Sequence, residues 1–132
     1  MNHSVLTQCR LFEDIPAQQL PVLLHALQAY EKHYDRGQPV YRVGDSAHAL
    51  CVLLSGGVTI ERDDAWGNKT ILDHISPGMV FAETYACVPG TPMMVSAVAA
   101  EPGEVLFLPA AQLFAPAAGA SDSRAVLLRN LL

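Results

Sequence analysis

The sequence is poor in the residues that build metal sites and disulfides. Its three cysteines, Cys9, Cys51 and Cys87, are an odd number at wide spacing. There is no Cys-x-x-Cys pair and no Cys/His spacing typical of zinc, and four cysteines for an iron–sulfur cluster are lacking. The five histidines are scattered. We therefore expect buried reduced thiols and no metal site.

Long apolar runs are also missing, although apolar residues make up 51% of the 132 residues. No uninterrupted run approaches the about 18 residues that would span a membrane. The N-terminus lacks the basic and apolar regions of a secretory signal. We expect one cytoplasmic domain with its own core and no membrane contact.

Positive charge is scarce. Eight Lys and Arg face thirteen Asp and Glu, the net charge is −5, and no Lys or Arg lies between Lys69 and Arg124. A protein that binds the phosphates of a nucleic acid needs a basic patch, so this chain is not expected to bind DNA directly. A nucleophile–base–orienter set and paired catalytic carboxylates are lacking too, so the sequence does not predict an enzyme.

The N-terminal third predicts a helix. Asp14 and Pro16 form a helix-start signal, although Pro21 allows a later start. Apolar residues then recur at three- and four-residue spacing, which predicts one amphipathic helix to about residue 30. The residues of this stripe are Leu20, Leu23, Leu24, Leu27 and Tyr30.

From residue 33 the period changes to short apolar segments separated by Gly, Pro and Asp. Such closely spaced turn residues are typical of an all-β sandwich or barrel. The expected strands span residues 38–43, 49–54, 58–62, 69–75, 94–100 and 104–108.

The C-terminal part predicts a short helix over 109–114, a small-residue connector over 115–120 and a helix from Ser121. Leu127, Leu128, Leu131 and Leu132 give that last helix an apolar stripe. The helix either lies on the barrel or forms the first turns of a longer helix that pairs with a partner. We favour the second interpretation, because uncovered apolar helix ends tend to associate.

Residues 76–87 predict a strand end, a turn at Pro77–Gly78 and a carboxylate, Glu83, at the mouth of a helical turn. A carboxylate among apolar neighbours needs hydrogen bonds. Glu83 either caps the amides of its own turn or anchors a ligand in a pocket. The residues expected to line this pocket are Phe81, Ala82, Glu83, Thr84, Tyr85, Met93 and Met94.

The order and spacing of several short motifs resemble the cyclic-nucleotide-binding fold, and more narrowly the sensor domain of CRP/FNR-type transcription regulators. The motifs are Leu11–Phe12, Gly44–Asp45, 55–58, Asp64 with Gly67, 77–83, 98–101 and 104–106. The resemblance implies a mainly β chain with flanking helices, folded as an eight-stranded antiparallel jelly roll. It also implies an effector domain over 1–120 and the start of a dimerisation helix over 121–132, with Leu127, Leu128 and Leu131 toward the partner of a homodimer. The DNA-binding winged helix-turn-helix of the family is absent from this chain.

The cassette of this family holds the cyclic phosphate with an Arg about ten residues after a Gly-Glu pair, and the Glu accepts from the ribose. In this sequence Ala82–Glu83 stands at the pair, while Met93 and Met94 occupy the positions of the Arg and the small residue after it. Without that Arg a buried phosphate would lose several kcal/mol of interaction. We therefore expect the domain not to bind cyclic nucleotides.

The expected effector is a small, largely apolar molecule with a donor group, or a cation. Three alternatives stay open. The first is a haem or redox sensor that uses His, Met or Cys, and the second is a true cyclic-nucleotide-binding domain. The third is an unliganded dimerisation scaffold whose pocket is filled by its own Met side chains.

Overall fold

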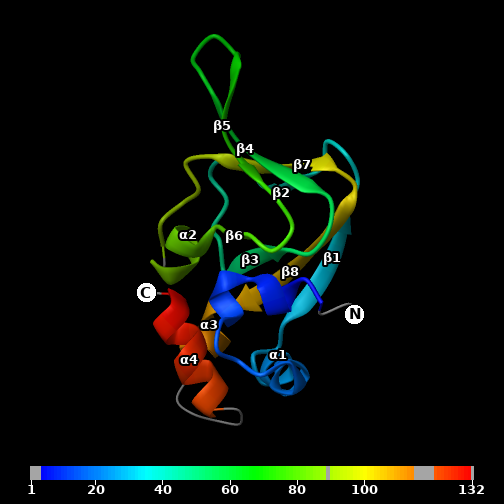
Figure 1. Cartoon of the computed structure of the whole chain (residues 1–132). Helices are drawn as coiled ribbons and strands as arrows, with labels where there is room; N and C mark the ends of the chain where they lie inside the picture. Colours follow the sequence, from blue (N-terminus) through cyan, green and yellow to red (C-terminus); the bar gives the residue numbers. More distant parts are fainter. Residues whose placement is uncertain (1–3, 89, 115–120, 132) are drawn as a thin grey trace.

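The protein was analysed as a computed structural model that describes residues 4–88, 90–114 and 121–131. Two four-stranded antiparallel sheets face one another (Figure 1). The first sheet runs β1 (Tyr30–Tyr34), β8 (Gly103–Pro109), β3 (Ala49–Leu53), β6 (Val80–Phe81). The second runs β2 (Pro39–Tyr41), β7 (Ser96–Glu101), β4 (Gly57–Asp63), β5 (Lys69–Ile75). The predicted antiparallel jelly roll with flanking helices is confirmed.

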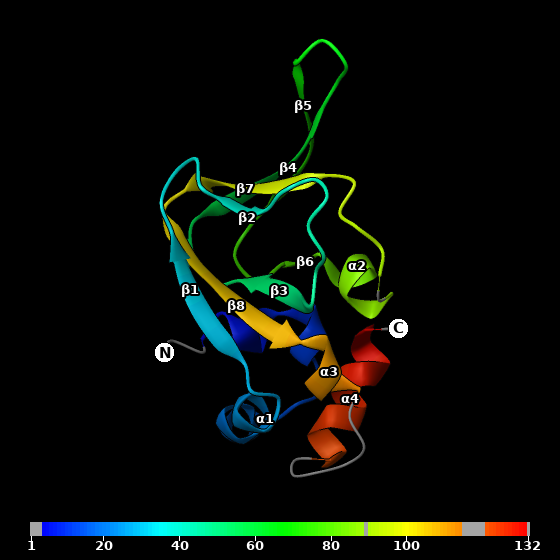
Figure 2. The ribbon, with the colours of Figure 1, turned by 180° about the vertical axis from the view of Figure 1, so that it is seen from behind.

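The helices gather beneath the first sheet, and the β4–β5 hairpin projects from the opposite end of the molecule (Figures 1 and 2). Three single 3₁₀ turns open the chain: η1 (Leu6–Gln8), η2 (Arg10–Phe12) and η3 (Ala17–Gln19). The α-helices are α1 (Leu20–Ala26), α2 (Glu83–Cys87), α3 (Ala110–Leu113) and α4 (Ser121–Leu131). Among the described helices, none is long and apolar enough to cross a membrane.

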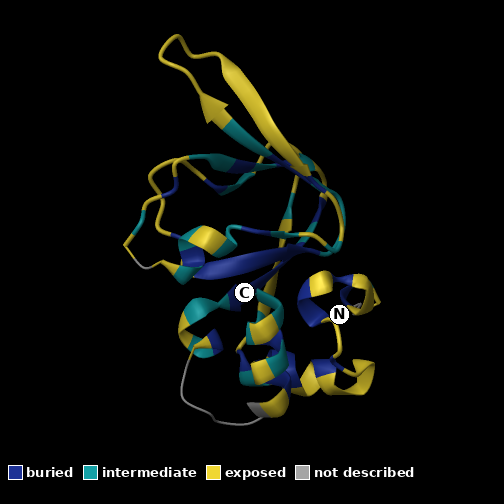
Figure 3. Ribbon diagram, turned by 60° about the vertical axis from the view of Figure 1, so that its left-hand side comes forward, coloured by how far each residue is buried: buried dark blue, intermediate teal, exposed yellow. Residues whose placement is uncertain are grey.

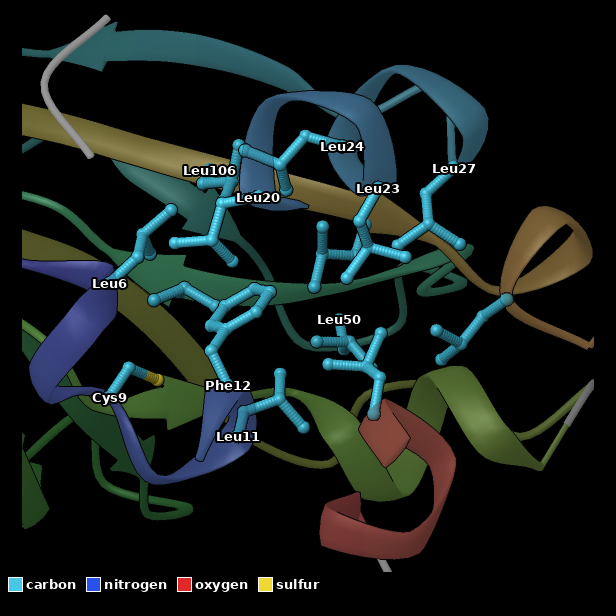
Figure 4. Close-up of a cluster of buried hydrophobic side chains, with 14 of the residues drawn as sticks. Leu6, Cys9, Leu11, Phe12, Leu20, Leu23, Leu24, Leu27, Leu50 and Leu106 are labelled. Atoms are coloured by element: carbon cyan, nitrogen blue, oxygen red, sulfur yellow. The ribbon is translucent and has the colours of Figure 1, made fainter. Parts of the chain in front are cut away.

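Strand β3 separates two hydrophobic cores, and all five of its residues are buried. Its side chains alternate between faces, as the period of two in a strand requires. Leu50 and Val52 pack against the helices, whereas Cys51 and Leu53 face the inside of the roll. Figure 4 shows the outer core, where side chains from the N-terminal turns and α1 converge on Leu50 and Leu106.

The prediction of a helix to about residue 30 is wrong. Helix α1 ends at Ala26, and Gln28 has a φ of 55°, a left-handed conformation that no helix can continue through. Tyr30 begins strand β1, where its ring stacks on Phe107 with a centroid distance of 5.0 Å. The leucines of the predicted stripe are nevertheless buried as expected, so the error concerns the end of the helix and the first strand.

The β4–β5 hairpin is the most exposed part of the fold (Figure 3). Every residue of β5 except Ile75 is exposed, and Trp66 at the tip is 84% exposed. The Asp64 carboxylate orders the tip, because it accepts the backbone amides of Trp66 and Asn68, both at 2.8 Å. Only the base of the hairpin therefore belongs to the roll.

Helix α4 packs against the outer core and the N-terminal turns of the same chain. Leu127 is completely buried in the outer core, and the Asn130 amide donates to the carbonyls of Leu11 and Glu13 at 2.9 and 2.7 Å. Leu128 and Leu131 are half-buried and pack against the same core. Of the three leucines expected at a dimer interface, Leu127 is thus occupied within the chain. A partner for the other two stays a prediction.

Helix α4 carries a buried charge, Arg124, that lacks a hydrogen-bonding partner among the described residues. Arg124 is only 5% exposed, and its Nε and Nη1 atoms are buried without a hydrogen-bond acceptor. The neighbouring Ser123 hydroxyl, in contrast, donates to the Gln19 side chain at 2.6 Å. An unpaired buried cation is costly, so the docked position of α4 combines favourable apolar packing with an unfavourable charge.

Candidate functional site

A cleft of about 200 Å³ lies between helix α2 and the inner face of the second sheet. The antiparallel register of β4 and β5 places Ile60 opposite Asp73 and Val58 opposite Ile75. The side chains that line the cleft come from β4, β5, β6, α2 and the start of β7. They are Ile60, Asp73, Ile75, Val80, Phe81, Ala82, Glu83, Thr84, Tyr85, Met93, Val95 and Ala97.

Six of the seven residues expected at the pocket line this one cleft, and Met94 does not. Met93 is 3% exposed, whereas Met94 is 71% exposed. Strand β7 begins only at Ser96, and the Met93 amide instead donates to the Asp45 carbonyl at 2.8 Å. This bond turns Met93 inward and leaves its neighbour outside. Whether the six residues bind a ligand stays a prediction.

Glu83 is the first residue of α2 and is half-buried. Its carboxylate makes no hydrogen bond or ion pair with any described residue, and no side chain caps the N-terminus of α2. The interpretation that Glu83 caps its own turn is therefore wrong. The carboxylate is left available to the cleft.

The thiols around α2 are kept neutral. Burial raises the pKa of Cys51 well above its usual range, and the Glu83 charge raises it further. Burial also raises the pKa of Cys87, again with a contribution from Glu83. All three cysteines are free; Cys9 and Cys51 are buried as expected, and Cys87 is half-buried. Because the thiolate is the reactive form, this environment does not favour a thiol-based redox sensor.

Ala82 precedes Glu83 in a left-handed conformation, with a φ of 64°. A residue with a Cβ is strained there, and glycine is not. The resemblance puts glycine at this position in the cyclic-nucleotide cassette, and glycine would adopt the angle of Ala82 without strain.

We expect Ala82→Gly to stabilise the protein by about 1 kcal/mol, because it relieves this strain. Urea unfolding followed by circular dichroism measures the change as a higher midpoint at constant m. Ala86→Gly in the same short helix is the matched control. It should destabilise the protein by at least about 1 kcal/mol, since Ala86 has no left-handed angle to relieve and the change also removes a buried methyl group. Equal effects of the two changes would contradict the strain at residue 82.

Asp73 is a cleft residue that the sequence analysis missed. It lies on β5 and shares the inward face with Ile75, two residues on. The register of β5 shifts by one residue between Ile71 and Asp73, which makes Leu72 the extra residue on this strand. The alternation of Asp73 with Ile75 was a usable signal, but the polar, exposed hairpin obscured which face was inner.

The cleft is acidic and has no positive side chain. Its described lining includes two carboxylates, Asp73 and Glu83, and no Lys, Arg or His. The rings of Phe81 and Tyr85 and the sulfur of Met93 supply its apolar surface. This lining does not fit haem. Met93 and Tyr85 are residue types that can ligate haem iron, but the described lining offers no positive partner for the two propionates.

Two further cavities border α2. A groove of about 330 Å³ has Glu83, Arg10, Asn130 and Leu131 in its lining. A larger cavity of about 440 Å³ next to Cys87 has His48 but no Asp, Glu, Lys or Arg in its described lining. Size alone would favour the larger cavity, but the Glu83 cleft holds the unpaired charges that can select a ligand.

The roll, its flanking helices and the α2 cleft define the class of cyclic-nucleotide-binding-like β-rolls. The profile of the family described as "Cyclic nucleotide-binding domain" matches residues 31–116, more than half of the chain. The chain therefore belongs to the cyclic nucleotide-binding domain family. No curated protein shows significant sequence similarity to it.

Similar solved structures include a catabolite activator protein and the sensor or N-terminal domains of transcriptional regulators. The Thermus thermophilus catabolite activator protein is 26% identical with a TM-score of 0.75, over 92% of this chain and 54% of that one. The sensor domain of the transcriptional regulator DNR from Pseudomonas aeruginosa is 26% identical with a TM-score of 0.70, over 98% of this chain and 75% of that one. The N-terminal domain of a Streptomyces coelicolor transcriptional regulator, 22% identical over 97% of this chain and 89% of that one with a TM-score of 0.77, shares the fold.

These comparisons confirm the resemblance to CRP/FNR-type sensor domains. The chain spans about half the length of the Thermus thermophilus activator. The family is one of binding domains, and the similar structures named above come from regulatory proteins.

Proposed function

We propose that this chain is the effector-sensing domain of a CRP/FNR-type transcription regulator and binds a small molecule other than a cyclic nucleotide. The observation that carries the proposal is the charge of the cleft. Met93 is buried where the family Arg would meet the cyclic phosphate, and the described lining has two carboxylates and no cation. A phosphate in this cleft would be desolvated beside like charges, at a cost of several kcal/mol.

The position of Glu83 supports transmission from the cleft to α4. Its side chain lines the cleft and also the groove that contains Asn130 and Leu131, at the end of α4. Asn130 holds α4 to the N-terminal turns through the Leu11 and Glu13 carbonyls. A ligand that moves the Glu83 carboxylate therefore changes the surface on which the end of α4 rests.

In this proposal residues 1–120 are the effector domain and 121–132 start a dimerisation helix. Leu128 and Leu131 are only half-buried, so they are the leucines that a partner helix can cover in a cytoplasmic homodimer. DNA contact belongs to a C-terminal domain outside this chain. The net charge of −5 supports this division, because it does not favour contact with phosphates.

The proposal is tested with cyclic AMP and cyclic GMP in thermal-shift and calorimetric titrations. We expect no saturable binding up to about 1 mM, whereas a bound ligand at 100 times its Kd would stabilise by about 2.7 kcal/mol. A cyclic-AMP-binding domain with the Arg in place serves as the positive control. Micromolar binding of either nucleotide to this chain would refute the proposed function.

The second candidate is a dimerisation scaffold without an effector, favoured by the half-buried Leu128 and Leu131 on α4. Light scattering over a range of concentrations distinguishes it. A dimer whose cleft accepts no ligand would support the scaffold, and a monomer at high concentration would exclude it.

A further inference from the structure

Two carboxylates reach the same cleft from opposite sides of the fold. Glu83 comes from helix α2, next to the first sheet, and Asp73 comes from β5 at the edge of the second sheet. They are ten positions apart in sequence, and the inward register of β5 brings Asp73 into the lining. A molecule in the cleft is therefore in contact with negative charge on two walls.

Neither carboxylate is neutralised within the described chain. Glu83 has no hydrogen-bonding or ionic partner there, and Asp73 accepts only the amide of His74, at 2.9 Å. Arg10 lines the neighbouring groove together with Glu83, but the two residues form no ion pair. The described lining holds no positive side chain to balance the half-buried Glu83 and the exposed Asp73, so the cleft favours a ligand that brings positive charge.

The remaining walls favour an organic cation over a metal ion. Ca²⁺ takes six to eight oxygen ligands and Mg²⁺ an octahedral set, and the described residues contain no group of three His, Cys, Asp or Glu that could hold a metal. The rings of Phe81 and Tyr85 and the thioether of Met93 instead offer faces that attract a desolvated ammonium and the apolar body attached to it.

From this arrangement, which rests on the proposed function, we propose that the effector is a small organic cation, an amine or quaternary ammonium with an apolar body. Its charged head lies between Asp73 and Glu83, and its apolar part lies against Phe81, Tyr85 and Met93. The volume of about 200 Å³ limits it to a molecule of roughly the size of a substituted single ring. The carboxylates thus select the charge, and the walls select the shape.

The charge dependence is tested with three probes of matched shape: benzylamine, benzyl alcohol and benzoate. Saturable binding is followed by NMR of ¹³C-methyl-labelled methionine. We expect benzylamine to shift the Met93 methyl signal by its ring current and to leave the Met94 methyl unchanged, because only Met93 lines the cleft. Benzyl alcohol should bind at least tenfold more weakly and benzoate not at all.

Variants assign the effect to the two carboxylates. Asp73→Asn and Glu83→Gln should each weaken benzylamine binding about tenfold and leave the weak binding of benzyl alcohol unaltered. Asp63→Asn, an exposed acid at the outer end of β4 on the same hairpin, is the matched control and should change nothing. Circular dichroism confirms that each variant is folded.

The possible results separate the two proposals. Equal binding of amine and alcohol, or an unchanged affinity in both cleft variants, would overturn the proposal of an organic cation. Either result would leave the proposal of a non-nucleotide effector standing. Absence of any Met93 shift with benzylamine and with benzyltrimethylammonium would overturn the organic cation as well. Binding of cyclic AMP in parallel titrations would instead refute the proposed function.

Discussion

Replacing Met93 with arginine is expected to reverse the charge preference of the cleft. The buried position of Met93 would hold the guanidinium among the cleft walls, beside Asp73 and Glu83. A cation there competes with an amine for the same carboxylates, so benzylamine affinity should fall about a hundredfold. The same cation supplies the partner that a cyclic phosphate lacks in the unaltered cleft, so cyclic AMP should become a detectable ligand. Isothermal titration calorimetry measures both changes.

Met94→Arg is the control for this exchange. It adds the same charge at the next residue, whose side chain is exposed and outside the cleft. It should leave both affinities nearly unchanged, apart from long-range effects that disappear at physiological salt. If Met93→Arg retained full benzylamine affinity while folded, Met93 would not be part of the ligand site.

Arg124→Met is expected to stabilise the protein by about 2 kcal/mol. The change removes a buried guanidinium whose Nε and Nη1 have no acceptor, and it keeps an unbranched side chain to fill the space under α4. The measurement is the free energy of unfolding from urea titration, with an unchanged m-value as the sign that the fold is intact.

Arg129→Met tests the opposite case on the same helix. Arg129 is exposed and pairs with Asp14 at 2.8 Å, so its loss should destabilise by less than about 1 kcal/mol. A destabilising Arg124→Met would mean that Arg124 finds an acceptor in solution. A carboxylate from a second copy of the chain is one such acceptor, and a concentration-dependent stability would reveal it.

The roll could be predicted because its signals are local. Turn residues between short apolar segments mark strands wherever they occur, and five of the six expected strands match β3, β4, β5, β7 and β8 to within two residues at each end. The sixth, over 38–43, contains the shorter β2. Strand β1 was missed because Tyr30 continues the leucine spacing of α1. The turn at Gln28, which separates the helix from the strand, contains no Gly or Pro that would have marked it in the sequence.

The cleft was only partly predictable. Glu83, Phe81 and Tyr85 belong to one continuous stretch, so a local motif could identify them, and Met93 followed from counting along the cassette. Asp73 lies on an exposed hairpin, and only the pairing of β5 with β4 shows that it faces inward. The prediction that Met94 lines the cleft failed for the same reason, because the face on which a side chain lies depends on where its strand begins.

The sequence alone already settled that residues 70–123 contain no Lys or Arg, and therefore that a site built from this segment lacks both. Charge and short-range pattern are properties of the chain itself, and they survive without coordinates. The tertiary structure decided that Asp73 and Glu83 line one cleft and that Leu127 is buried beneath the roll. It also decided that the Nε and Nη1 atoms of Arg124 find no acceptor among the described residues. These outcomes depend on strand register and helix docking, which arise from contacts between residues far apart in the sequence.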